Sequence, residues 1–224
     1  IKWPNGHITE NTDIEINAML EYNQSDSKPD NINGNEVSIK LFKEVTDTLG
    51  IEYSHHENNF VEFKVDRLAL KQSSRSGPKL SVADVNNDGV DDFFIGGASG
   101  QCDELFISGP YGKYIQSTLD CDRKSIKVET LGSVFFDVDG DGDKDIYSVS
   151  GGSEYPLGSE ELMDRLYLND GFGKFTKAPE GVLPKAFSNG SVVAAGDYDN
   201  DGDEDLFVGG GSMPGNYPNA ALGG

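Results

Sequence analysis

Basic residues are scarce in this sequence of 224 residues. It has 18 Lys and Arg against 39 Asp and Glu, which gives a formal net charge of -21 at pH 7. A protein that binds the phosphate backbone of a nucleic acid needs a basic patch or stripe, and the sequence shows no such cluster. The composition therefore argues against nucleic acid as a partner.

The sequence also lacks a long hydrophobic run, a secretory signal and a lipid box, so we expect no membrane-spanning segment in it. Common catalytic motifs are missing as well: there is no Gly-x-Ser-x-Gly, no P-loop and no cluster of histidines. His55 and His56 adjoin Glu57, but neighbouring residues of a strand face opposite sides and cannot easily bind one ion. We therefore predict no catalytic residues and a polar loop around His55.

Only two cysteines are present, Cys102 and Cys121. Their midpoint falls inside residues 109–112 (Gly-Pro-Tyr-Gly), which read as the turn of a β-hairpin. Opposite residues of an antiparallel pair have Cβ atoms about 4.5–5.5 Å apart, close to the separation that a disulfide needs. We favour a Cys102–Cys121 disulfide over two unrelated thiols, and with it an oxidising, extracytoplasmic setting.

Acidic residues gather in three copies of one loop, D-x-[DN]-x-D-G-x-x-D, at residues 84–92, 137–145 and 197–205. Oxygen ligands at positions 1, 3, 5 and 9 suit a hard cation such as calcium, the glycine permits a sharp bend, and position 7 can offer its carbonyl. We therefore predict about three bound Ca²⁺ ions. The candidate ligands are Asp84, Asn86, Asp88, Val90, Asp92, Asp137, Asp139, Asp141, Asp143, Asp145, Asp197, Asp199, Asp201, Asp203 and Asp205.

Short apolar runs flank each loop, which predicts the unit strand, cation loop, strand, Gly-Gly. An EF-hand would place its last acid at position 12 between helices, and a dockerin would also continue with helices. Hairpin patterns follow the first two units, at residues 104–117 and 164–176. With its hairpin, each of these two units is predicted to form four strands. The loops begin 53 and 60 positions apart, which is typical of β-propeller blades.

The phrases at residues 81–89 (SVADVNNDG) and 92–98 (DFFIGGA) resemble the FG-GAP or VCBS repeat, a calcium-loop blade of integrin α-chain propellers and bacterial surface proteins. Residues 42–51 are similar to the start of bacterial propellers of this group. Residues 1–6 (IKWPNG) resemble the end of the small ASPIC/UnbV β-module that accompanies such propellers. The resemblance implies a propeller and calcium, but no ligand.

We thus expect an all-β fold: a β-propeller fragment of about three four-stranded blades, preceded by the end of a small β-module. The fragment interpretation rests on size, because a closed propeller has about 4–8 blades. We place the module at residues 1–22, a polar linker at 23–36 and the partial propeller at 37–224, with two or three further strands within residues 37–72.

The expected function is binding: a cell-surface, outer-membrane-anchored or secreted scaffold that presents loops to a protein or glycan partner, in an uptake or adhesion assembly. A sugar platform of Tyr147, Tyr155, Tyr167 and Tyr217 is one interpretation, although aromatic residues are common in strands. The alternative is an enzyme such as a propeller-type polysaccharide lyase, which would need a Lys, Arg, Tyr or His base in a central groove.

Overall fold

The computed structural model describes residues 1–5, 7–10, 22–29, 42–70, 74–119, 121–122, 125–185 and 189–210. The chain divides into two compact units, Ile1–Glu44 and Val45–Gly224. No helix in these described ranges is long and apolar enough to cross a membrane.

The first unit contains a short antiparallel pair formed by β1 (His7–Ile8) and β2 (Lys28–Pro29). The 3-10 helix η1 (Gln24–Asp26) precedes β2, and Asn23 caps it by accepting a hydrogen bond from the Ser25 amide. Part of the segment 23–36, for which we predicted a linker, thus forms a 3-10 helix and a short strand. The polar composition that suggested a linker also suits a capped turn.

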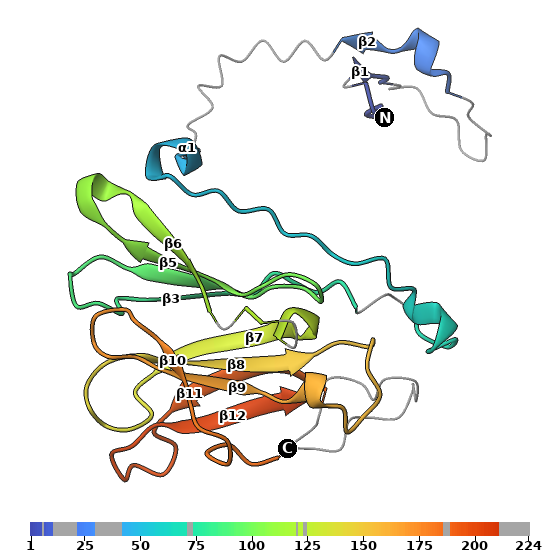
Figure 1. Ribbon diagram of the computed structural model, residues 1–224. Coiled ribbons are helices and arrows are strands. Elements are labelled where there is room, and N and C mark those ends of the chain that lie inside the picture. Colours follow the sequence, from blue (N-terminus) through green and yellow to red (C-terminus); the bar gives the residue numbers. More distant parts are fainter. Residues whose placement is uncertain are drawn as a thin grey trace. The chain divides into compact units, whose positions relative to one another are not determined.

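The first sheet of the second unit is four-stranded and antiparallel, in the order β3-β4-β5-β6 (Figure 1). Its strands are β3 (Leu80–Ala83), β4 (Asp92–Ile95), β5 (Glu104–Ser108) and β6 (Tyr114–Thr118). A second such sheet follows, with the strands β7 (Glu129–Phe136), β8 (Asp145–Gly151), β9 (Arg165–Leu168) and β10 (Thr176–Lys177). Both predicted hairpins, and thus two four-stranded units, are confirmed.

The third sheet consists of β11 (Gly190–Gly196) and β12 (Asp205–Gly210). The described part of the chain ends with β12. The fold is thus a series of separate antiparallel sheets, as expected for an all-β chain. Within the described ranges these sheets do not close into a ring.

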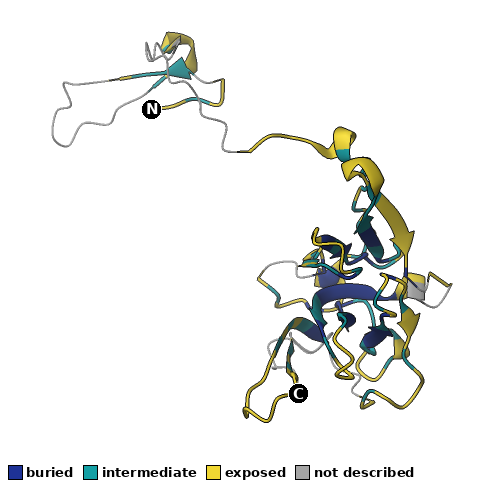
Figure 2. Ribbon diagram, turned by 90° about the vertical axis from the view of Figure 1, so that its left-hand side faces the viewer, coloured by how far each residue is buried: buried dark blue, intermediate teal, exposed yellow. Residues whose placement is uncertain are grey.

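Two apolar layers hold the three sheets together. Figure 2 shows the buried residues in dark blue. Ile146 and Tyr147 are neighbours on β8, so they face opposite sides of the sheet. Ile146 packs with Phe94 and Leu105 of the first sheet, whereas Tyr147 lies in the cluster that receives Val193 and Leu206 of the third. The middle sheet is therefore buried on both faces.

The Gly-Gly pair after β4 lets the middle sheet approach closely. A Cβ atom on Gly96 would lie 2.7 Å from Cγ2 of Thr130, which is too close for a real contact. The carbonyl of Gly97 accepts a hydrogen bond of 3.0 Å from the Thr130 amide, so β7 begins directly against this pair. The glycines thus permit the stacking of one sheet on the next.

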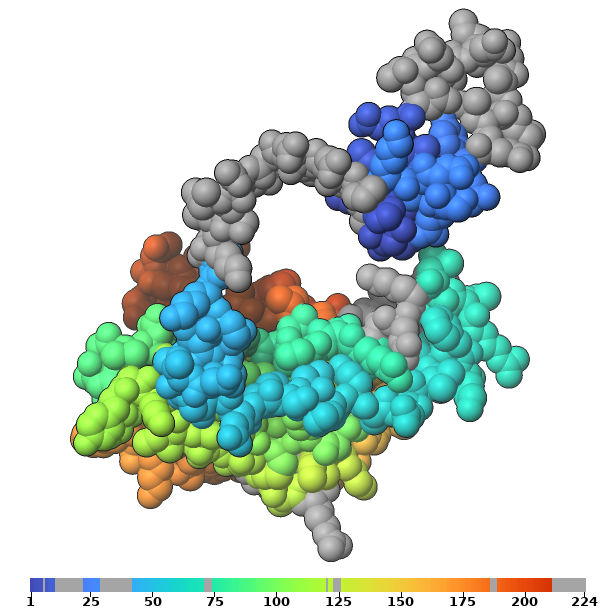
Figure 3. Space-filling view, turned by 90° about the horizontal axis from the view of Figure 1, so that it is seen from above, coloured from blue at the N-terminus to red at the C-terminus, as the bar shows by residue number. Residues whose placement is uncertain are grey.

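Residues 42–70 contain only the short helices α1 (Thr46–Leu49) and η2 (Glu62–Lys64), so the prediction of strands there was wrong for these residues. Residues 61–66 (VEFKVD) alternate as a strand would, but here the acids Glu62 and Asp66 are buried and the apolar residues are exposed. Figure 3 shows residues 45–70, in blue to cyan, lying over the green part of the same unit. Tyr53 packs edge-on against Phe106, and the Gln101 side chain donates to the Ser54 carbonyl at 2.8 Å.

Three further 3-10 helices lie in the connections between strands. They are η3 (Pro110–Gly112), η4 (Ser125–Lys127) and η5 (Glu160–Leu162). η3 forms the turn of the first hairpin, in which Tyr111 has a φ of 63°.

Candidate metal centres

The three acidic loops occupy equivalent places, since each joins the first two strands of its sheet. The last residue pairs before the loops are Ala83 with Asp92, Phe136 with Asp145, and Gly196 with Asp205. The aspartate at position 9 is therefore the first residue of the second strand in all three copies.

The aspartate at position 1 folds each loop around itself. In the middle loop, Asp137 accepts hydrogen bonds from the amides of Gly140 and Gly142, at 2.8 and 3.0 Å. Asp84 and Asp197 accept from the position-6 amides of Gly89 and Gly202 in the same way. The three position-6 glycines have φ values of 83°, 97° and 103°, a region that residues with a side chain rarely adopt.

Hydrogen bonds within the loops also orient the carboxylates at position 5. Each accepts from the amide two residues later: Asp88 from Val90, Asp141 from Asp143, and Asp201 from Asp203. At position 3, the amide oxygen of Asn86 accepts from the Asp88 amide at 3.1 Å. These hydrogen bonds join residues only a few positions apart, so each loop is bent into a turn by contacts within its own sequence.

Two of the loops bring three carboxylates together. Oxygens of Asp137, Asp139 and Asp141 lie within 4.8 Å of one another, and so do those of Asp197, Asp199 and Asp205. The first loop has an amide, Asn86, in place of the second carboxylate. Carboxylate and carbonyl oxygens at such separations are the donors that calcium prefers, so the residues fit this ion.

Position 7 differs between the loops. Val90 can offer only its backbone, whereas Asp143 and Asp203 also carry carboxyl groups. Burial, followed by the neighbouring Asp141, raises the pKa of Asp143 to about 6. The hydrogen bond with Asp201 and its charge raise the pKa of Asp203. Crowded carboxylates thus repel each other in these loops, and a bound cation would relieve that repulsion.

Position 9 has a structural role in the first two sheets. Asp92 is fully buried and accepts from the amides of Val85 and Ser108, at 2.9 and 2.6 Å. Asp145 does the same with Val138 and Asn169, and burial raises its pKa. These carboxylates therefore tie the loop to the third strand of their sheet. Asp205 is exposed and accepts a hydrogen bond from the Tyr198 amide of its own loop.

The second and third loops contact each other through their position-8 residues, which the sequence analysis did not consider. Glu204 accepts a hydrogen bond of 3.0 Å from the Asp137 amide and lies 3.6 Å from the Lys144 ammonium. The two loops line a cleft of about 620 Å³. In the sequence, the only sign of this contact was the opposite charge of the two position-8 residues, Lys144 and Glu204.

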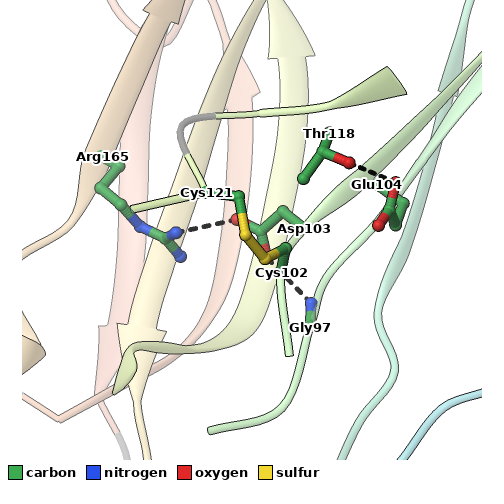
Figure 4. Close-up of a disulfide and its surroundings, with 7 residues drawn as sticks. All are labelled: Gly97, Cys102, Asp103, Glu104, Thr118, Cys121 and Arg165. Carbon is green, nitrogen blue, oxygen red and sulfur yellow. Dashed lines mark hydrogen bonds and ion pairs between the residues drawn. A yellow bond between two sulfur atoms is a disulfide. The ribbon is translucent and has the colours of Figure 1, made fainter. Parts of the chain in front are cut away.

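The predicted Cys102–Cys121 disulfide is present, with Cα atoms 5.5 Å apart (Figure 4). In the strand register, Glu104 lies opposite Thr118. Cys102 and Cys121 are therefore one position out of direct opposition. Beside the bridge, Asp103 accepts from the Gly97 amide and forms a buried ion pair of 2.8 Å with Arg165. This pair links the first sheet to the middle one.

The remaining candidates have ordinary structural roles. The hydroxyl of Tyr147 donates to Asp164 at 2.8 Å, and Tyr167 is 1 % exposed in the core, so the sugar platform was wrong for these two. Tyr155 is half-buried, and Tyr217 lies outside the described residues. His55 pairs with Glu57 at 2.9 Å, whereas His56 is exposed, as the alternation of sides predicts.

Residues 137–208 match the family model of the FG-GAP-like repeat. This segment is an FG-GAP-like repeat. It begins at the first ligand of the second loop and ends within β12, so the matched range contains two loops and the strands from β8 to β11, but not β7. The first loop, on which the resemblance was first noted, lies outside the matched range. No curated protein matches the chain.

Proposed function

We propose that this chain is a calcium-stabilised binding module of the β-propeller type, which acts outside the cytoplasm and presents loops to a protein or glycan partner. The FG-GAP-like repeat supports a propeller-like binding module. The observation that carries the calcium assignment is the clustering of three carboxylates in each of two loops. The disulfide supports an oxidising compartment, in which millimolar calcium is also found.

The ions would be held by positions 1, 3, 5 and 9 of each loop, with the carbonyl of position 7. A bound calcium supplies positive charge where four to six acidic residues crowd each loop. The protein contributes the bent loop and its link to the sheet, because the carboxylates of Asp92 and Asp145 also accept amides from neighbouring strands. The ion therefore stiffens the rim of each sheet, from which a partner could be contacted.

Calcium removal tests this proposal. Three independent sites at tenfold calcium excess would stabilise the fold by roughly 4 kcal/mol, so EDTA should lower the midpoint of thermal unfolding by roughly 10 °C. Calorimetry with EDTA, and after adding back Ca²⁺ or Mg²⁺, measures this. We expect calcium to restore the midpoint and magnesium to restore it poorly, because magnesium prefers to keep its water ligands. An unchanged midpoint under EDTA would contradict the proposal.

A further inference from the structure

The turn that follows β9, at residues 169–173 (Asn-Asp-Gly-Phe-Gly), contacts two of the acidic loops. A Cβ atom on Gly171 would lie 3.1 Å from Oδ2 of Asp143, in the second loop. A Cβ atom on Gly173 would lie 3.6 Å from Cβ of Asn86 and from Cγ2 of Val85, in the first loop. The turn is therefore packed against both loops, although these belong to different sheets.

Asn169, the first residue of this turn, hydrogen-bonds to both loops. It is buried, and its Nδ2 donates to the carbonyl of Val85 at 2.8 Å and to the carbonyl of Lys144 at 3.2 Å. Its backbone amide donates to Oδ1 of Asp145 at 2.8 Å. Val85 is position 2 of the first loop, whereas Lys144 and Asp145 are positions 8 and 9 of the second. One residue thus joins two loops that lie 84 and 25 positions before it in the sequence.

The side-chain amide of Asn169 has no unused capacity for hydrogen bonds. Its Oδ1 accepts from the amides of Asp170 and Gly173, at 2.9 and 3.1 Å, while both hydrogens of Nδ2 are donated to carbonyls. An aspartate at this place would lose both donors, and an alanine would lose all four bonds. The contact between the loops therefore requires an amide of this size.

These bonds hold backbone groups next to candidate ligands. The Val85 carbonyl shares a rigid peptide group with the amide nitrogen of Asn86, the position-3 ligand of the first loop. The Lys144 carbonyl shares one with Asp145, the position-9 ligand of the second loop, and the Asp145 carboxylate itself accepts from Asn169. Asn169 therefore restricts one ligand-bearing segment in each loop.

The first sheet has a different residue at the equivalent place. The Ser108 amide donates to the position-9 acid Asp92, as the Asn169 amide does to Asp145. The Ser108 hydroxyl, however, donates to Asp88, which belongs to the loop of its own sheet. Ser108 therefore supports one loop, whereas Asn169 supports two.

We propose that Asn169 is a positioning residue that couples calcium binding in loop 84–92 to calcium binding in loop 137–145, so that occupation of one raises the affinity of the other. A loop that is ordered by its ion also holds Asn169, and fewer backbone groups of the other loop then remain to be ordered. By linkage, the effect must be equal in both directions. The proposal rests on the calcium assignment made above and adds how two of its sites communicate.

A calcium titration of the full chain, followed by amide NMR, tests this coupling. The glycines at position 6, Gly89, Gly142 and Gly202, each report one loop, because each amide bonds to the position-1 carboxylate of its own loop. Asp88→Asn, at an exposed ligand position of the first loop, should raise the calcium concentration that half-saturates the Gly142 signal by about fivefold. Asp141→Asn should shift the Gly89 signal by the same factor.

Asn169→Ala should make the two loops independent, so that adding Asp88→Asn to it leaves the Gly142 midpoint unchanged. The matched control is Asn59→Ala, which removes an exposed amide elsewhere and should preserve the coupling. The third loop provides an internal reference, because the hydrogen bonds of Asn169 go to the first two loops and to its own turn. The Gly202 midpoint should therefore not respond to Asp88→Asn.

The two aspartate variants decide the question even if Asn169→Ala does not fold, since they leave Asn169 in place. An unchanged Gly142 midpoint in Asp88→Asn, an equal shift of Gly202, or a shift that persists in Asn169→Ala would overturn the coupling. If the three glycine signals respond to calcium independently of one another, the coupling fails and the calcium assignment stands. If none of them responds to calcium in the wild type, both fail.

Discussion

At the scale of single residues, each acid of a loop has its own task. Position 1 bends the loop by accepting amides, as Asp137 does with Gly140 and Gly142, whereas position 9 ties the loop to the sheet. Asp139, at position 3, is exposed, and its carboxylate lies in the cluster of possible ligands. Its replacement should therefore affect the ion more than the fold.

We expect Asp139→Ala to lower the number of bound calcium ions by about one per chain, because one of the few ligands of one site is removed. Equilibrium dialysis against calcium at millimolar concentration measures the count. Glu180→Ala removes an exposed acid outside the loops and serves as the matched control. A count that stays the same in Asp139→Ala would remove this residue from the ligand set.

Glu129 should give the free protein an unusual pH dependence. Its pKa is about 8 in the folded chain against 4.5 for an ordinary glutamate, so between these values the folded state holds a proton that the unfolded state has lost. Stability should therefore fall as the pH rises from about 4.5 through 8, by up to about 1.4 kcal/mol per pH unit.

Denaturant unfolding of wild type and Glu129→Gln, at saturating calcium and several pH values from 5.5 to 8.5, measures this effect. The stability difference between the two proteins isolates Glu129, because the carboxylates of the calcium loops titrate in both. We expect Glu129→Gln to gain stability over wild type as the pH rises. A difference that does not change with pH would show that Glu129 titrates normally.

At the scale of elements, the hairpin of β5 and β6 is held by its disulfide and by the ladder between its strands. The bridge joins residues 19 apart in the sequence, so it restricts a short loop of the unfolded chain. We expect Cys102→Ser with Cys121→Ser to destabilise the protein by roughly 3 kcal/mol at most. Amide exchange in β6 should accelerate more than in β8, which is buried between two other sheets.

Reduction of the wild-type protein provides the control for this variant. A reductant should lower the unfolding midpoint of the wild type and leave that of the double serine variant unchanged. Equal stability of the oxidised and reduced wild type would show that the ladder alone holds the hairpin.

At the scale of the whole second unit, the outer sheets each keep large apolar side chains exposed among the described residues. On β3, Leu80 and Val82 are 62 % and 53 % exposed, and on the third sheet Val192 and Phe207 are 54 % and 71 % exposed. Their neighbours Val193 and Leu206 pack inward, because successive residues of a strand alternate between faces.

We expect the calcium-loaded chain to bind a hydrophobic fluorescent dye at these faces. Val192→Thr with Phe207→Ser should lower the fluorescence, because large exposed apolar patches are the sites that such dyes occupy. Tyr198→Ser is the control, since Tyr198 is 89 % exposed but lies in a loop. Equal fluorescence in the double variant and the wild type would place the dye elsewhere.

Local patterns of the sequence determined the strands, the loops between them and the hairpins. This was possible because the loop residues hydrogen-bond within a few positions, as Asp84 does with Gly89, and because alternating apolar residues mark a strand. The pairing of Cys102 with Cys121 followed from the turn between them. The candidate calcium ligands were likewise taken from the spacing, and both this ligand set and its binding of calcium stay predictions.

Contacts between segments distant in the sequence were decided only by the tertiary structure. Glu129 was one of many acids in the sequence, and only the packing of segments distant in the sequence buried it, with no hydrogen bond to its Oε1 from the described residues. The same holds for Arg165 with Asp103 and for Glu204 with Asp137, which join residues 62 and 67 positions apart. No local pattern encodes such pairs, because they form only when one sheet packs on the next.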